Sequence, residues 1–217
     1  PLLDTVGLAG RLIARLGSAT QRAALLPKVI EGSCKLTCAY LERGERYDAA
    51  PKATTARRTS EGWELNGEKI VVMGAGVADK LVVSADAGGT SLFIVDRQAA
   101  GVELSGYRTV DGQRAADVRF KGVKLPADAL LGEAGKGAEA LDEAIDFATA
   151  LLCADAIGAM KYANEATLEY LKTRKQFGVP IGSFQVLQHR IVDMVIVTEQ
   201  ARSMAILAAA RVDGSSD

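Results

Sequence analysis

The 217-residue sequence has few of the residues that mark metal sites, disulfide frameworks or nucleic-acid surfaces. It contains three cysteines, one histidine and 5% aromatic residues, and its 26 basic residues nearly balance 27 acidic ones. Three cysteines form neither an even disulfide set nor a metal-binding spacing, so we expect Cys34, Cys38 and Cys153 to be reduced core residues. A net charge of −1 gives no electrostatic reason to bind nucleic acid or a membrane surface.

The sequence also lacks long apolar runs, with none of the roughly 18 residues that a membrane span needs, and it lacks a charged leader followed by an apolar segment. We therefore expect no transmembrane span, no signal peptide and a cytoplasmic location. Apolar residues make up 48% of the chain, enough to bury a substantial core in more than one packing unit. Because both ends fall near helical patterns, we interpret the chain as an interior piece of a longer protein.

The period of the hydrophobic pattern changes twice, which predicts an α+β protein with several domains. Residues 1–35 have helical spacing and form the end of an N-terminal helical domain. Residues 36–131 contain short β-branched runs and form a β-barrel-like domain. Residues 132–217 form the first part of a C-terminal helical bundle, with long antiparallel helices over about 138–173 and 183–212 as the first two of four.

Turn and helix-breaking residues refine this outline. Gly17 with Ser18, and separately Pro27, interrupt the first helical pattern. Asn66 and Gly67 lie between two strand patterns and predict a type I′ hairpin. Ser183 is a plausible N-cap for the last helix. The predicted strands are residues 36–41, 52–59, 62–65, 68–72, 80–85, 91–95 and 116–125.

The most informative stretch lies between the two long helical patterns. It reads Arg-Lys-Gln-Phe-Gly over residues 174–178 and continues through a Gly/Pro loop to Gln185. An arginine, two glutamines and a phenylalanine at a helix-to-helix corner suit an anionic phosphate diester and a flat ring. The same spacing also fits an ordinary helical hairpin with polar surface residues.

Residues 173–194 resemble, nearly residue for residue, the signature of the flavin-dependent acyl-CoA dehydrogenases. Weaker matches occur in family order at residues 62–69, 101–102, 123–128 and 131–132. The resemblance implies α,β-dehydrogenation of an acyl-CoA thioester, in which a carboxylate takes the α-proton and FAD receives the β-hydrogen as hydride. It also implies that Arg174 binds a phosphate of FAD, that Gln176 and Gln185 hydrogen-bond nearby, and that Phe177 packs on the cofactor of a neighbouring subunit.

The residues implied for the flavin ring depart from the family pattern. Residues 41–48 replace a Thr-Glu-Pro-Gly-x-Gly-Ser-Asp segment, and residues 71–75 replace Trp-Ile-Thr-Asn-Gly, so hydroxyl donors and an aromatic shield are lost. Backbone N–H groups there still suit the flavin, although residues 71–73 also fit a simple buried strand. The implied cofactor contacts are Leu41, Glu42, Val71, Val72 and Met73, and Tyr47 takes the position of a serine that binds the substrate.

No catalytic base is expected within this chain. In most of the family the base is a glutamate farther downstream, and in a minority it occupies the position of Ala148, followed by an arginine where this chain has Thr149. Glu143 and Asp146 are interpreted as solvated carboxylates on a helix face. Two further polar residues have structural interpretations: Asp155 as a buried interhelical contact and His189 as an anchor of the helix hairpin.

The resemblance implies a homo- or hetero-oligomer, either a dimer or a dimer of dimers, with an acyl-CoA substrate and an electron-transfer acceptor. The leading interpretation is a subunit of an FAD-dependent acyl-CoA dehydrogenase. The substituted ring-side residues also suggest a non-catalytic binding or assembly subunit of a heteromeric enzyme, similar to the divergent small subunits that act on dicarboxylyl or steroid-side-chain CoA esters. A third alternative is a family member recruited to another thioester or nitroalkane oxidation.

Overall fold

The computed structural model describes residues 2–213, which form two compact units divided after Ala148. The first unit opens with the π-helix η1 (Leu3–Gly10), followed by α1 (Arg11–Leu16) and α2 (Ala19–Ile30). Ser18 begins α2 with a capping box, in which its hydroxyl and the side chain of Gln21 satisfy each other's backbone N–H groups. Pro27 is predicted to interrupt the helix, but α2 continues through it. The carbonyl that loses its hydrogen bond belongs to the exposed Ala23 and can be hydrated.

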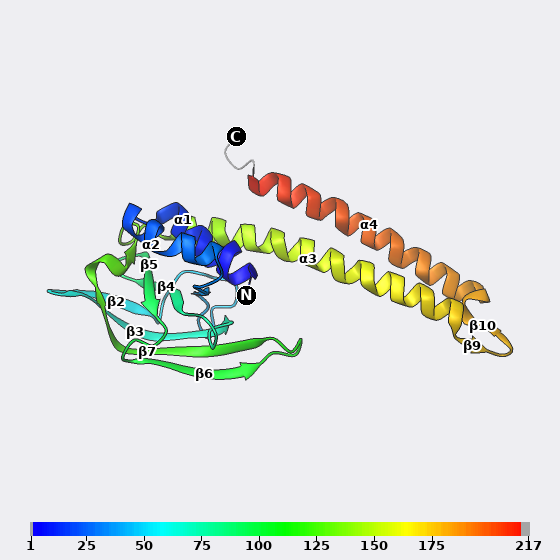
Figure 1. Cartoon of the computed structure of the whole chain (residues 1–217), viewed down its shortest axis with the longest axis horizontal. Coiled ribbons are helices and arrows are strands. Elements are labelled where there is room, and N and C mark those ends of the chain that lie inside the picture. The colour runs from blue at the N-terminus through cyan, green and yellow to red at the C-terminus, as the bar shows by residue number, and fades with distance from the viewer. Residues whose placement is uncertain (1, 214–217) are drawn as a thin grey trace. The chain divides into compact units, whose positions relative to one another are not determined.

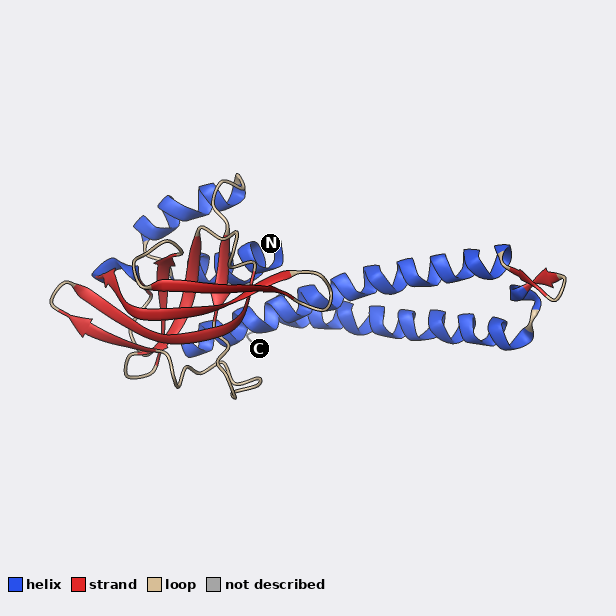
Figure 2. Cartoon of the chain, turned by 90° about the horizontal axis from the view of Figure 1, so that it is seen from below, coloured by secondary structure: helices blue, strands red, loops and turns tan. Residues whose placement is uncertain are grey.

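Eight strands form one twisted, mostly antiparallel sheet in the order β6-β7-β3-β2-β4-β5-β8, with β1 pairing in parallel to β4 (Figure 2). Within the described residues β6 and β8 each pair on one side only, so the sheet is open and not a closed barrel. The strands are β1 (Leu36–Ala39), β2 (Thr55–Thr59), β3 (Gly62–Met73), β4 (Lys80–Asp86), β5 (Thr90–Asp96), β6 (Val102–Arg108), β7 (Arg114–Pro126) and β8 (Leu130–Leu131).

Two hydrophobic clusters hold the first unit together. In the first, side chains from β3 and β7 such as Leu65 and Phe120 pack against side chains from β4 and β5 such as Val83 and Phe93. In the second, the N-terminal helices, which lie along one side of the sheet in Figure 1, pack their apolar residues on β1, β4 and β5. The sheet is therefore buried on both faces near its centre, which explains the continuous apolar runs of β4 and β5.

The Asn66-Gly67 hairpin prediction is wrong, because both residues lie inside the continuous strand β3. They form a bulge, at which the pairing of β3 with β7 shifts register. Gly67 has φ 140°, and a Cβ there would lie 2.5 Å from the Cα of Thr54, so the glycine is needed for close approach. The Asn66 side chain accepts a hydrogen bond from the Gly122 N–H at 2.8 Å, and the chain turns earlier, between β2 and β3.

The cysteine prediction is correct for two of the three residues. All three are free, and Cys34 and Cys38 are buried, whereas Cys153 is exposed within this chain. The residues that the structure describes contain no group of histidine, cysteine, aspartate and glutamate side chains suited to a metal ion. None of the described helices is both long enough and apolar enough to cross a membrane.

The second unit is a helical hairpin. Helix α3 (Ala138–Thr173) begins in the first unit and continues into the second, where α4 (Gln185–Asp213) runs back antiparallel to it (Figure 1). The connection contains the two-residue strands β9 (Lys175–Gln176) and β10 (Val179–Pro180) and the 3₁₀ turn η3 (Ile181–Ser183). The family-like α+β fold is thus as predicted, apart from the open sheet.

Two details of this hairpin differ from expectation. Ser183 does not cap α4, since its hydroxyl donates to the Pro180 carbonyl oxygen at 2.8 Å and the helix begins at Gln185. His189 is exposed, and the two helices are joined by a hydrogen bond from the Asn164 side chain to the Thr198 hydroxyl at 3.0 Å. That hydroxyl in turn donates to the Met194 carbonyl oxygen at 2.8 Å.

Candidate functional site

The structure brings together the two segments implied for the flavin ring, residues 41–48 and 71–75. The Ile70 N–H donates to the Leu41 carbonyl oxygen at 2.9 Å, which fixes the first segment beside the end of β3. The Thr37 hydroxyl donates to the Met73 carbonyl oxygen at 2.7 Å, which ties the second segment to β1. These bonds use backbone carbonyls, so they hold each segment in place regardless of the side chains at Leu41 and Met73.

Glu42 belongs to the first of these segments, and its carboxylate is buried. One oxygen accepts from the Lys69 ammonium at 2.8 Å and the Thr54 N–H at 2.9 Å, and the other accepts from the N–H groups of Lys52 and Ala53 at 2.9 and 2.7 Å. Burial acts to raise the pKa of Glu42, but these hydrogen bonds outweigh it and lower the pKa to about 2. Direct contact of this carboxylate with a ligand would require opening bonds that hold the loop.

Lys69 provides the counter-charge from the middle of β3, where its side chain is fully buried. Its ammonium also donates to the Ser84 hydroxyl at 2.9 Å and to the Tyr40 carbonyl oxygen at 3.3 Å. Burial lowers the pKa of Lys69, and the hydrogen bond and charge of Glu42 oppose that shift. The ammonium thus has an acceptor for each of its three N–H bonds.

Three non-glycine residues in the described chain have a positive φ: Arg46 at 46°, Val71 at 51° and Phe177 at 52°. Such a conformation is unfavourable for residues with a Cβ, and most of all for a β-branched residue such as valine. Each of the three lies in a different segment that the sequence assigned to the cofactor or substrate. Strained backbone of this kind concentrates at functional sites, so its location supports a site in these segments.

The remaining predicted site residues of the first unit differ in how exposed their side chains are. Val72 is buried, Leu41 and Met73 are half-buried, and Val71 is 39% exposed. Tyr47, expected to contact the substrate, is 99% exposed. The accessible surface at these segments is therefore formed by Val71, the flanking backbone and the loop that carries Tyr47.

Asp117 on β7 is a residue that the sequence analysis missed. Its carboxylate accepts hydrogen bonds from the Val71 N–H at 3.2 Å and from the Tyr107 hydroxyl at 2.9 Å, and it meets the Arg43 guanidinium at 3.2 Å. It therefore contacts both ring-side segments. No local motif marks it, because its partners come from β3, β6 and the loop after β1.

In the second unit, the predicted phosphate corner is exposed. Phe177 and Gly178 both have positive φ between the paired strands β9 and β10, the backbone form of a type I′ turn. Phe177 is 91% exposed and touches the ring of Phe184 edge-on at 6.1 Å between centroids. The Arg174 and Gln185 side chains are exposed and have no hydrogen bond or ion pair to the described residues, whereas Gln176 donates to the Lys175 carbonyl oxygen at 2.9 Å.

The acidic residues near the expected base position are partly or fully exposed on the helix. Glu143 is partly exposed and forms an ion pair with Arg15, and Asp146 is exposed. Ala148, at the position where a minority of the family carries its base, is buried. Asp155 is exposed in this chain, so the expected burial of its side chain is not observed.

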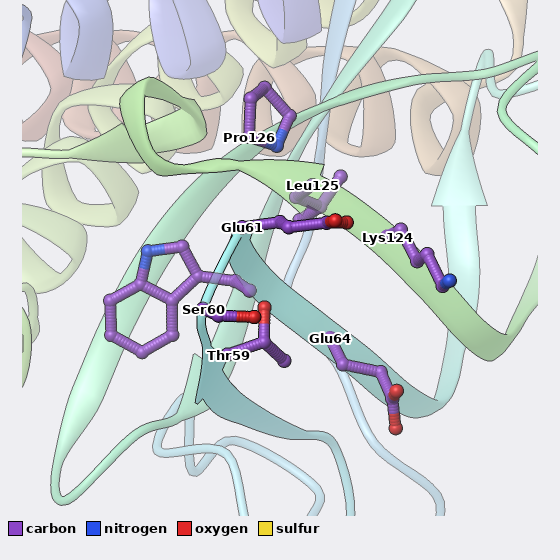
Figure 3. Close-up of a pocket in the computed structure, with 8 residues that line it drawn as sticks. Thr59, Ser60, Glu61, Glu64, Lys124, Leu125 and Pro126 are labelled. Atoms are coloured by element: carbon purple, nitrogen blue, oxygen red, sulfur yellow. The ribbon is translucent and has the colours of Figure 1, made fainter.

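A cavity of about 440 Å³ lies at the opposite end of β3 from the ring-side segments. Figure 3 shows Glu64 and Lys124 extending from neighbouring strands beside the Thr59–Glu61 turn. The buried Trp63 indole contributes to its wall and contacts Phe93 edge-on at 5.2 Å between centroids. The indole N–H has no acceptor, but it is shielded from solvent and offers no accessible donor to a ligand.

Comparison with known proteins identifies the family. Residues 37–123 match the family model "Acyl-CoA dehydrogenase, middle domain", and residues 135–216 match "Acyl-CoA dehydrogenase, C-terminal domain". The chain therefore belongs to the acyl-CoA dehydrogenase family. It is 30% identical to the probable acyl-CoA dehydrogenase FadE25 of Mycobacterium tuberculosis, an alignment that covers 98% of this chain and 57% of that protein.

Solved structures give the same result. Butyryl-CoA dehydrogenase from Megasphaera elsdenii aligns with TM-score 0.91 and 29% identity over 97% of this chain and 57% of its own. A Tcur3481-Tcur3483 steroid ACAD variant aligns with TM-score 0.86 and 36% identity over 100% of this chain and 57% of its own. A glutaryl-CoA dehydrogenase from Mycobacterium smegmatis, in complex with FADH2, aligns with TM-score 0.88 and 25% identity over 94% of this chain and 54% of its own. The chain spans little more than half the length of these relatives.

The buried pair generates a stability prediction. Replacing Glu42 with Gln in the complete protein should lower the free energy of unfolding by about 3–5 kcal/mol, because Lys69 would lose its buried counter-charge. The double variant Glu42→Gln/Lys69→Met should recover part of that loss, since it removes the unpaired ammonium as well. Denaturant unfolding measures both variants, and a double variant no more stable than the single one would contradict the pairing.

The same pair should make stability depend on acid. Because the folded-state pKa of Glu42 is about 2 against an ordinary 4.5, its stabilisation is complete above the higher value and is lost as pH falls toward the lower one. The loss amounts to about 3 kcal/mol. The double variant should therefore lose less stability than the unmodified protein across this range. A Glu31→Gln control at an exposed position should lose as much stability as the unmodified protein.

Proposed function

We propose that this chain is part of a subunit of an FAD-dependent acyl-CoA dehydrogenase that introduces an α,β double bond into an acyl-CoA thioester. Support comes from the family membership, from the FADH2 complex of a structural relative and from the strained residues Arg46, Val71 and Phe177. The observation that carries the proposal is Phe177, an aromatic side chain held in a left-handed turn with 91% of its surface exposed. Such a side chain is suited to packing on a partner outside its own unit.

FAD fits the residues present. On the phosphate side, the guanidinium of Arg174, which has no ion pair to the described residues, suits a phosphate oxygen, with Gln176 and Gln185 as additional hydrogen-bonding groups and Phe177 as an apolar contact. On the ring side, the backbone of residues 41–42 and 71–73, apart from the Val71 N–H that Asp117 already accepts, offers N–H and carbonyl groups in a framework held by Glu42 and Lys69. When bound, FAD supplies hydride acceptance, while this chain's residues bind and orient it.

The proposed catalytic base lies outside this chain, and the electron acceptor is proposed to be a separate electron-transfer protein. Ala148 and Thr149 occupy the positions where some of the family carries a base and its following arginine, and neither side chain is suited to proton abstraction. The chain's proposed contribution is therefore to hold the cofactor and, through the loop of Tyr47, one side of the acyl-CoA.

A second candidate function is a non-catalytic binding or assembly subunit of a heteromeric acyl-CoA dehydrogenase. It is favoured by the loss of hydroxyl groups at Leu41 and Met73 and of the aromatic shield at Val71, set against an intact phosphate corner. The steroid ACAD relative carries a double designation, Tcur3481-Tcur3483, which suits a two-component enzyme.

Flavin stoichiometry separates the two functions. The leading proposal expects the complete protein, expressed alone, to purify with about one FAD per chain and to lose flavin absorbance when an acyl-CoA is added anaerobically. The second function expects little flavin until the partner subunit is added, and a Leu41→Thr/Met73→Thr variant should then raise its occupancy. Absence of flavin both alone and with every acyl-CoA dehydrogenase partner would contradict both.

Arg174→Ala should weaken FAD retention at least about tenfold, because a charge-assisted contact to phosphate contributes about 1.5–3 kcal/mol. Arg174→Lys should recover only part, since an ammonium cannot bind two oxygens as a fork. Flavin dissociation constants of the reconstituted complete protein measure both. Arg202→Ala, which removes an exposed arginine on α4, is the control, and an equal effect of both alanine variants would assign Arg174 to general surface charge.

The helical hairpin is proposed to assemble through its apolar faces into a dimer or a dimer of dimers. Ile196 and Leu207 are 50% and 48% exposed and, eleven residues apart, lie on one face of α4. A double Ile196→Glu/Leu207→Glu variant of the complete protein should show a lower mass by light scattering than the unmodified protein. Glu199→Gln is the control, and a monomeric unmodified protein would contradict the assembly. The exposed apolar residues of the hairpin include Leu151, Leu152, Met160, Leu168, Val192, Val195, Ile196, Met204, Ile206 and Leu207.

A further inference from the structure

A single carboxylate connects the two segments that the proposed function places beside the flavin ring. Asp117 Oδ1 accepts from the Val71 N–H at 3.2 Å and from the Tyr107 hydroxyl at 2.9 Å, while Oδ2 lies 3.2 Å from the Arg43 guanidinium. Arg43 belongs to residues 41–48 and Val71 to residues 71–75. Asp117 itself lies on β7, the strand that pairs with β3, so it approaches both segments from the body of the sheet.

Val71 needs such a partner because of its backbone. The pairing of β3 with β7 shifts register between Lys69 and Val72, and Val71 occupies this bulge with φ 51°. The left-handed conformation is unfavourable for a β-branched residue, and its free-energy cost lowers the population of that conformation roughly 5- to 30-fold. A hydrogen bond from its N–H to a carboxylate is charge-assisted and offsets part of this cost.

The contact of Asp117 with Arg43 contributes less. The Arg43 side chain is 73% exposed, and ion pairs in such surroundings add little stability. Arg43 also meets a second carboxylate, Glu68, at 3.8 Å, so it does not depend on Asp117 alone. The Tyr107 hydroxyl on β6 binds the same oxygen as the Val71 N–H, and the hydrogen bond to the Val71 N–H is the contact through which Asp117 acts directly on the bulge.

We propose that Asp117 is a positioning residue of the flavin site, which holds Val71 in its left-handed conformation and so fixes the backbone of residues 70–73. This inference rests on the proposed function, because it assumes that the flavin ring meets this backbone. It also explains why fixed backbone matters here. Where side-chain hydroxyl donors are replaced by the aliphatic groups of Leu41 and Met73, the remaining polar contacts come from the main chain, and their direction depends on the bulge.

The test uses two measurements on the complete protein: the FAD dissociation constant, and deuterium exchange of the backbone amides of residues 70–75 without FAD. Asp117→Ala should raise the dissociation constant about 5- to 30-fold and speed this exchange, because the strain at Val71 loses its compensation. Asp117→Asn keeps an acceptor for the Val71 N–H and should have a smaller effect. Adding Val71→Gly to Asp117→Ala should recover binding in part, since glycine adopts positive φ without a Cβ penalty.

Glu68→Ala is the matched control, because it removes a carboxylate near Arg43 without touching the Val71 N–H, and it should change neither measurement. An equal effect of Glu68→Ala, an unchanged Asp117→Ala variant, or failure of Val71→Gly to recover any binding would each overturn the proposal. If the unmodified protein binds no FAD with or without a partner subunit, the proposed function fails. The exchange measurement would then still decide whether Asp117 holds the bulge.

Discussion

The candidate site of the first unit depends on one buried ion pair, Glu42 with Lys69. The carboxylate accepts hydrogen bonds from the backbone N–H groups of residues 52–54, where the chain returns to the sheet after the loop that follows β1. The ammonium, on β3, also binds the Ser84 hydroxyl on β4. Removing two charges from water costs several kcal/mol per ion, so the pair is weak evidence for stability and better evidence for a specified geometry. What it specifies is the path of the loop beside the end of β3.

Backbone strain identifies the same places as the sequence motifs, by an independent route. Arg46, Val71 and Phe177 have left-handed backbone, and each falls in one of the three segments assigned to ligand contact. Strain persists only where surrounding contacts determine it. In the first unit those contacts include Asp117 at Val71, and in the second they include the pairing of β9 with β10 around the Phe177 turn. At Val71 the strain is therefore supported by a residue outside the ligand-binding motifs, whereas at Phe177 it is supported by strands that belong to the motif itself.

Periodicity in the sequence was sufficient for the helices and for most strands, because burial on one face repeats at a fixed interval. It failed where the deciding contact is distant in sequence. Asn66-Gly67 has the local chemistry of a hairpin, but the approach of Thr54 and the Gly122 N–H make it a bulge. Strand β6 was missed because few of its residues are apolar and it lies at an edge. The contacts of Asp117, and separately the contact between Asn164 and Thr198, join residues that are distant in sequence, so no spacing could reveal them.

The departures from the family pattern have a common physical character. At Leu41, Val71 and Met73 the side chains have changed, but the hydrogen bonds to the Leu41 and Met73 main-chain carbonyls are present, from the Ile70 N–H and from the Thr37 hydroxyl. A site built from main-chain groups tolerates changes of side chain as long as the framework behind it is kept. Glu42, Lys69 and Asp117 are that framework here, and all three point toward the protein rather than toward a ligand. In the proposed site, the constraint on the ring side would thus be carried by residues whose side chains face the protein and not the cofactor.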